Sequence, residues 1–177
     1  MLVPSIAIHL ATATEYLKNH PEENKDDFII GSISPDLVPD TNISHHSNPN
    51  SFDNGLNYLV GKVDLKQCLK DFDFGTSFGR GYFLHLITDK EFYLALSKTR
   101  DDFGEMSHAR LKELLYGDYS VVNGFFKEKY ELTFPEAVKE HDFSIAGEPK
   151  LLDVEKICGL IGELGEMDLG EYYKQLA

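Results

Sequence analysis

The chain has 177 residues, of which 42% are hydrophobic and 27% charged, enough apolar material for the core of one globular domain. Its 17 Lys and Arg face 30 Asp and Glu, which gives a formal net charge of -13 at pH 7. That balance argues against sequence-independent binding to nucleic acid, which depends on neutralising phosphates, and equally against docking on anionic membranes.

Apolar residues recur at helical spacing from the start of the chain. One apolar stripe predicts a first helix over 4–19, with Pro21 just beyond its end. A short buried helix is predicted over 27–34, because Pro35 keeps the residue before it out of helical angles. The segment that follows, 35–51, is rich in Pro and Asn and is predicted to be a loop.

The longest predicted helix, 78–98, carries apolar side chains on every face, which is typical of a buried central helix. Strand alternation is weak throughout, so we predict an all-α fold in a single domain of residues 1–177. Helices after residue 101 are expected to form a helical cover. The shorter predicted helices span 54–60, 64–69, 105–116, 119–129, 134–140, 153–161 and 168–176.

The central helix also carries polar side chains among apolar ones. His85 and Asp89 are four residues apart, so they project from one face of the helix. A buried, unpaired carboxylate is costly, so Asp89 needs a cation or strong donors. The pair is open to two interpretations: two metal ligands, or a His–Asp hydrogen bond inside a bundle. Gly81, one turn earlier, indicates either a closely approaching backbone or a frayed first turn.

Further candidates occur earlier in the chain, and each has an ordinary structural interpretation. His9 borders the apolar stripe of the first helix, where a histidine is most often a core residue. Asp36 follows Pro35, where an aspartate is commonly a turn former. His45 and His46 lie in the Pro- and Asn-rich segment, where histidines are commonly exposed.

Taken in order, these residues form a pattern. It runs His9, Gly31-Ser32-Ile33-Ser34-Pro35-Asp36, Ser44-His45 and Gly81-Tyr82-Phe83-Leu84-His85-Leu86-Ile87-Thr88-Asp89. This pattern resembles the zinc-dependent phospholipase C family, in particular its small, intracellular-type bacterial members, over residues 1–95. The resemblance implies a multi-helix fold of the phospholipase C and three-zinc nuclease type.

The resemblance also implies a ligand set. One metal ion would be held by Asp36, His45, His85 and Asp89, and His9 would hold a second ion, with Asp89 bridging the two. His46 is the alternative to His45, but Ser44-His45 matches the Ser-His of the family better. Mixed imidazole and carboxylate ligands suit zinc or another divalent transition metal, as one or two ions.

The chain departs from the secreted members of that family. Those members use the processed amino-terminus as a ligand and bind a third ion through a His-x-x-x-Glu pair. Here His108 and His141 lack that spacing, so no third ion is expected. The N-terminus has no basic region before its apolar residues, which favours a cytoplasmic protein over an exported one. The two cysteines, Cys68 and Cys158, are expected to be buried, reduced thiols.

The leading functional hypothesis is a metal-dependent hydrolase, a phosphoesterase that acts on a small, soluble phosphoester. Asp36 would be a ligand and also a candidate general base, with Lys62 and Arg80 as candidate substrate cations. One alternative is a non-catalytic helical scaffold or binding module, with a structural metal or a His/Asp hydrogen-bond network. Another is an HD-domain-like phosphohydrolase, for which the chain offers only His141-Asp142.

Overall fold

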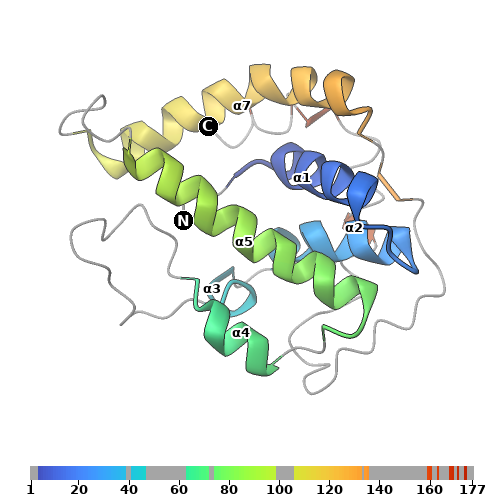
Figure 1. The fold of residues 1–177 in the computed structure, drawn as a ribbon. Helices are drawn as coiled ribbons and strands as arrows, with labels where there is room; N and C mark the ends of the chain where they lie inside the picture. The colour runs from blue at the N-terminus through green and yellow to red at the C-terminus, as the bar shows by residue number, and fades with distance from the viewer. Residues whose placement is uncertain are drawn as a thin grey trace.

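A long central helix organises the computed structural model of the chain (Figure 1). This helix, α5, spans Ser77–Lys98 and packs against elements that come before it in the chain. All elements of the described residues are helical, with no strand among them, which confirms the all-α prediction at the level of fold class. The structure describes residues 4–38, 41–46, 63–71, 74–98, 106–132 and 134–135, with isolated positions between 159 and 174.

The other elements surround α5 in two groups. On one side lie the first two helices, with α7 packed against α1; α3 and α4 lie toward the opposite side in the view of Figure 1. A 3₁₀ turn, η1, continues directly from α2 and contacts both α3 and α5. The bounds are α1 (Ile6–Asn19), α2 (Lys25–Ile33), η1 (Ser34–Leu37), α3 (Thr41–Ser44), α4 (Leu65–Asp71) and α7 (His108–Tyr130).

Side-chain caps fix where three of these helices begin. Ser5 is the N-cap of α1 and accepts a hydrogen bond from the backbone N–H of Ile8 at 3.3 Å. Asn24 caps α2 and Ser107 caps α7 in the same way. At the other end of α7, Glu131 adopts a left-handed conformation with φ 52°, which stops the helix.

The main core lies where α1, α2 and α5 meet. Aliphatic residues of the first two helices pack against aromatic residues of α5, and Cys68 of α4 is buried in the same cluster. The core members on these elements are Ile6, Ala7, Leu10, Ala11, Ile29, Ile30, Ile33, Phe78, Tyr82 and Leu86. Within the described part of the chain, no helix has the length and apolar character to cross a membrane.

Several predicted elements match the structure and some do not. The predictions for 4–19, 27–34, 64–69 and 78–98 are confirmed to within a few residues as α1, α2, α4 and α5. The loop prediction for 35–51 is wrong in part, because η1 and α3 lie inside it. Residue range 54–60 lies outside the described residues, as do most of 153–161 and 168–176. Phe134 and Pro135, the described part of 134–140, are not helical.

The prediction of separate helices over 105–116 and 119–129 is wrong, because α7 runs through both without a break. Gly117 lies in its interior at a cost of about 1 kcal/mol relative to alanine. Burial of one face offsets that cost: Leu111, Tyr116, Tyr119 and Asn123 are buried along α7. Tertiary packing therefore outweighs the tendency of Gly117 to interrupt the helix.

Candidate metal centre

Two glycines set the distance between α2 and α5. A Cβ built on Gly31 would lie 2.2 Å from the carbonyl oxygen of Phe78, and one on Gly81 would lie 2.0 Å from that of Phe28. Both contacts are with backbone atoms, so neither helix could accept even an alanine without moving. The close-approach interpretation of Gly81 is therefore correct, and Gly31 is its partner across the crossing.

Five polar residues gather beside this crossing from four separate elements. His9 comes from α1, Asp36 from η1 and His45 from the residue after α3, while α5 supplies His85 and Asp89. The three histidines and Asp89 are at most 1% exposed, and the Asp36 side chain is 9% exposed. The structure thus brings together all five residues that the sequence pattern singles out.

The two carboxylates alternate with the histidine rings. Asp89 Oδ1 lies 3.3 Å from His9 Nε2, and its Oδ2 lies 3.2 Å from His45 Nε2. Asp36 Oδ1 is 3.4 Å from His45 Nε2, and Oδ2 is 3.6 Å from His9 Nε2. His85 Nε2 is 3.8 Å from both carboxylates. Around a tetrahedral ion with ligands at about 2.0–2.1 Å, neighbouring ligand atoms are about 3.3–3.4 Å apart, close to three of these six separations.

Hydrogen bonding leaves part of this cluster unsatisfied. Both ring nitrogens of His9 and both carboxylate oxygens of Asp89 are buried and have no partner in hydrogen-bond geometry within the described structure. Buried polar atoms are nearly always paired, and an unpaired one costs about 1–3 kcal/mol. Atoms that converge without bonding to one another are the expected geometry of ligands around a cation.

The tautomers of His45 and His85 follow from their neighbours. His85 Nδ1 lies 2.8 Å from the carbonyl oxygen of Ser32, which can only accept, so Nδ1 carries the proton. The Ser44 hydroxyl donates to the carbonyl oxygen of Pro35 at 2.8 Å, so it accepts from His45 Nδ1 at 3.0 Å. In the neutral rings both Nε2 atoms then present lone pairs, and they lie 3.1 Å apart. Two facing lone pairs require a positive charge between them, either a proton or a metal ion.

Proton equilibria in the cluster agree with that requirement. Burial lowers the pKa of His45, but its contacts with Asp36 and Asp89 outweigh burial and raise the pKa to about 10. Burial and the charge of His9 lower the pKa of His85 to about 3. Burial disfavours both carboxylates, yet the nearby histidines hold the pKa values of Asp36 and Asp89 below their ordinary range. At neutral pH His45 is therefore protonated between two ionised carboxylates.

The ligand atoms divide into two groups of three. One group is His9, His85 and Asp89, and the other is Asp36, His45 and His85; within each group the ligand atoms lie within 4.8 Å of one another. His85 belongs to both, and its ring stacks on His9 with centroids 3.7 Å apart. Asp89 directs one oxygen to His9 and the other to His45, the arrangement that a bridging carboxylate needs.

The alternative histidine, His46, takes no part in either group. It has φ 48°, and its ring lies edge-on to Tyr82 at 6.5 Å between centroids. Its backbone carbonyl accepts from Asp64 N at 3.0 Å, so this residue joins the loop to the start of α4. Of the two adjacent histidines, the structure thus directs only His45 into the cluster.

Arg80 has a structural role, which corrects its assignment as a substrate cation. Its Nε donates to both carboxylate oxygens of Glu22 at 2.8 and 2.9 Å, and its Nη1 to the carbonyl oxygens of Phe74 and Gly75. The guanidinium therefore joins α5 to the segment before α2. Lys62, His141 and Asp142 lie outside the described residues, as does the side chain of His108.

Sequence reasoning missed the groups that hold the histidines in place. The carbonyl of Ser32 fixes His85. His45 is fixed by the hydroxyl of Ser44, which itself bonds to the carbonyl of Pro35. The Tyr82 hydroxyl donates to the Ser44 carbonyl and so holds the same segment. Ser44 and Tyr82 stand inside the quoted motifs, so a signal existed for them. The direction of a backbone carbonyl leaves no trace in the sequence.

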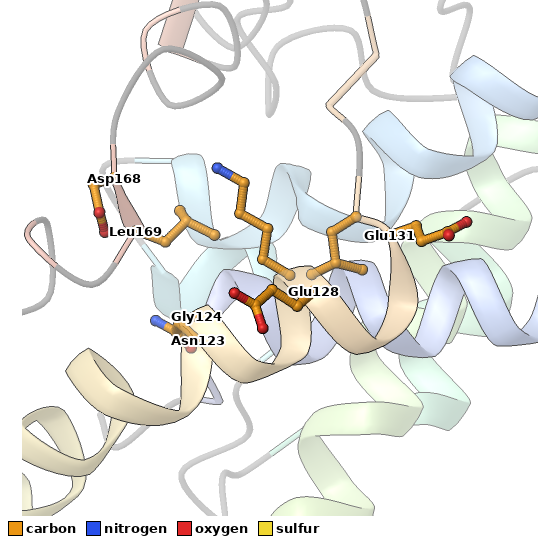
Figure 2. A pocket seen from close by; sticks show the side chains of 8 residues that line it. Asn123, Gly124, Glu128, Glu131, Asp168 and Leu169 are labelled. Carbon is orange, nitrogen blue, oxygen red and sulfur yellow. The ribbon is translucent and has the colours of Figure 1, made fainter.

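A cavity outside the His/Asp cluster lies along α7. It has a volume of about 660 Å³ and includes no residue of the His/Asp cluster. Figure 2 shows Glu128, Glu131 and Asp168 among its walls, and Lys127 is the one cation among the residues that line it. An acidic lining without converging donors does not suit an anionic ligand, so this cavity is a poor competitor to the cluster.

Comparisons with family models, curated proteins and solved structures found no match to the chain. The fold and the site therefore define this protein only as an all-helical protein with a buried His/Asp cluster of metal-ligand composition.

Proposed function

We propose that the chain is a metal-dependent hydrolase of small phosphoesters, with a centre formed by His9, Asp36, His45, His85 and Asp89. The observation that carries the proposal is the pair of Nε2 atoms of His45 and His85, 3.1 Å apart, between two carboxylates. Such a set of nitrogen and oxygen ligands suits zinc and other divalent transition metals. A divalent ion there would polarise a phosphoryl oxygen and lower the pKa of a bound water.

The residues of the centre would divide the remaining tasks. Asp89, fully buried and shared between His9 and His45, suits a bridging ligand. Asp36 has the most exposed side chain of the five, which supports an added role as the base that takes a proton from water. The formal charge of -13 favours a small, soluble phosphoester over a nucleic-acid polymer or an anionic bilayer.

Burial of the cluster supports a second candidate function, a structural metal site in a non-catalytic protein. Four of the five side chains are at most 1% exposed, and structural sites are closed whereas catalytic ones keep an open position. The two functions differ in one measurable property, the ability of the loaded centre to take up an exogenous anion.

The test begins with protein purified without a histidine tag, stripped by a chelator and titrated with zinc. We expect about two equivalents to bind, and the loaded protein to hydrolyse bis(p-nitrophenyl) phosphate. Absence of metal uptake would reject both functions. Uptake of zinc without phosphate binding or turnover would leave the structural role and reject the hydrolase.

The adjacent histidines provide a matched pair of variants for this test. His45→Ala removes a ligand and should weaken zinc binding by 100-fold or more, with loss of turnover. His46→Ala removes an imidazole of the same type one residue further on and should change zinc affinity by less than threefold. Equal effects of the two substitutions would contradict the proposed ligand set.

A further inference from the structure

Tyr93 is a buried polar residue that the proposed ligand set does not use. It lies on α5 four residues after Asp89, so the two side chains leave the same face of the helix one turn apart. Its side chain is 0% exposed, and its ring packs with Leu111 of α7 and edge-on to Phe92. The ring therefore packs between α5 and α7.

The hydroxyl of Tyr93 is unsatisfied. Among the described residues, no group forms a hydrogen bond with it. A buried tyrosine normally finds a partner for its hydroxyl, and a phenylalanine would fill the same space without the cost of burying that group. An unsatisfied buried group in a folded protein needs an explanation, and a bound ligand is one.

The charges near Tyr93 show what kind of group it would meet. Burial, and then the negative charges of Asp89 and Asp36, raise the pKa of Tyr93 well above its usual value. The phenol therefore stays protonated at neutral pH and remains a hydrogen-bond donor. The charges of Asp89 and Asp36 act on the Tyr93 hydroxyl, yet neither carboxylate accepts a hydrogen bond from it.

We propose that Tyr93 contacts the substrate, and that its hydroxyl donates a hydrogen bond to an oxygen of a tetrahedral oxyanion of the phosphoryl class bound at the centre. This inference rests on the proposed function. The two carboxylates of the cluster repel an anion, and a neutral donor one turn from Asp89 adds attraction for an anionic oxygen without burying another charge. Binding of the oxyanion also supplies the partner that the Tyr93 hydroxyl lacks.

The experiment compares Tyr93→Phe with Tyr16→Phe in zinc-loaded protein. Tyr16 is a matched control because it is a half-buried tyrosine near the end of α1, stacked on Phe28 at 5.2 Å and outside the cluster. Zinc content, thermal midpoint and affinity for inorganic phosphate are measured on each, the last by calorimetry. For Tyr93→Phe we expect unchanged zinc content, phosphate binding weaker by tenfold or more, and a thermal midpoint without phosphate that is no lower than the parent's. Tyr16→Phe should bind phosphate within twofold of the parent.

Each other outcome overturns the inference. Equal phosphate affinity in parent and Tyr93→Phe would show that the hydroxyl does not touch the anion, while the proposed function stands. Loss of zinc from Tyr93→Phe would assign the residue to positioning of the ligands and not to substrate contact. Absence of zinc or phosphate binding in the parent protein would reject the proposed function and this inference together.

Discussion

Glycine occupies two opposite situations in this molecule. At the α2–α5 crossing, a Cβ on Gly31 or Gly81 would lie 2.2 or 2.0 Å from a backbone oxygen. Along α7, a Cβ on Gly117 or Gly124 would meet nothing within 4 Å. Glycine is thus required for close helix packing at the crossing. Along α7 it lowers helix stability and permits no closer packing.

The two regions also differ in what they carry. The α2–α5 crossing holds the carbonyl oxygen of Ser32 2.8 Å from His85 Nδ1 and so fixes one ring of the His/Asp cluster. The outer face of α7 carries exposed apolar side chains, Val121 at 75% and Phe125 at 58%. Close backbone packing therefore coincides with the His/Asp cluster, whereas the two glycines of α7 have no such close neighbour.

The largest expected effect comes from filling the crossing. Gly81→Ala forces α2 and α5 apart, because the new methyl group would overlap the carbonyl oxygen of Phe28. We expect a loss of about 3 kcal/mol in the free energy of unfolding, the upper end for overpacked cores. Zinc affinity should fall with it, since Ser32 and His85 move apart. Urea denaturation and zinc titration measure both, and a variant as stable as the parent would show that the helices are not in contact at this point.

Next in size is removal of the shared carboxylate charge. Asp89→Asn keeps the shape of the side chain, but it should release both ions and abolish hydrolysis. A ligand present at 100 times its dissociation constant stabilises the folded state by about 2.7 kcal/mol, so at least that much should be lost in zinc-containing buffer. Unfolding in zinc and in chelator should then give the same midpoint. Two retained ions with full activity would reject the dinuclear centre.

A third prediction concerns the proton on His45. The folded pKa is raised to about 10 from an unfolded value near 6.5, so the proton stabilises the metal-free fold fully below about pH 6.5, and that stability is lost as pH rises through about 10. Zinc must displace this proton, so its affinity should rise about tenfold per pH unit between pH 6.5 and 8.

Calorimetry in buffers of different ionisation heat counts the protons released by zinc. We expect His45 to release one proton at pH 7 and His85 to release none, because burial keeps the pKa of the His85 ring near 3. His46→Ala should leave this number unchanged. Binding without proton release would mean that His45 is neutral in the metal-free protein. It would contradict a His45 pKa raised by Asp36 and Asp89.

The smallest expected effect has the opposite sign. Gly124→Ala lies in the interior of α7, where a methyl group has open space, so it should stabilise the protein by about 0.5–1 kcal/mol through helix propensity alone. Urea denaturation measures the change, and zinc affinity should stay as in the parent. Destabilisation by Gly124→Ala would show that other atoms pack against this face of α7. Gly124 would then resemble Gly81 in having no room for a methyl group.

Local patterns along the chain were enough to predict the helical class and the residue types of the cluster. Hydrophobic period is a local property, so α1, α2, α4 and α5 could be predicted from it, and a polar residue among apolar ones marked His85 and Asp89. The resemblance to the zinc-dependent phospholipase C family added His9, Asp36 and His45, which no local argument distinguished from ordinary core, turn and loop residues. Their identity as ligands remains a prediction, although the structure brings all five together.

The tertiary structure establishes which groups meet. It directed His45 and not His46 to the cluster, paired Arg80 with Glu22, joined two predicted helices into α7 and left the Tyr93 hydroxyl without a partner. Each of these outcomes depends on where a distant backbone or side chain lies in space. The Ser44-His45 motif favoured His45 over His46 in the sequence, and the structure places only the His45 ring against Asp36 and Asp89.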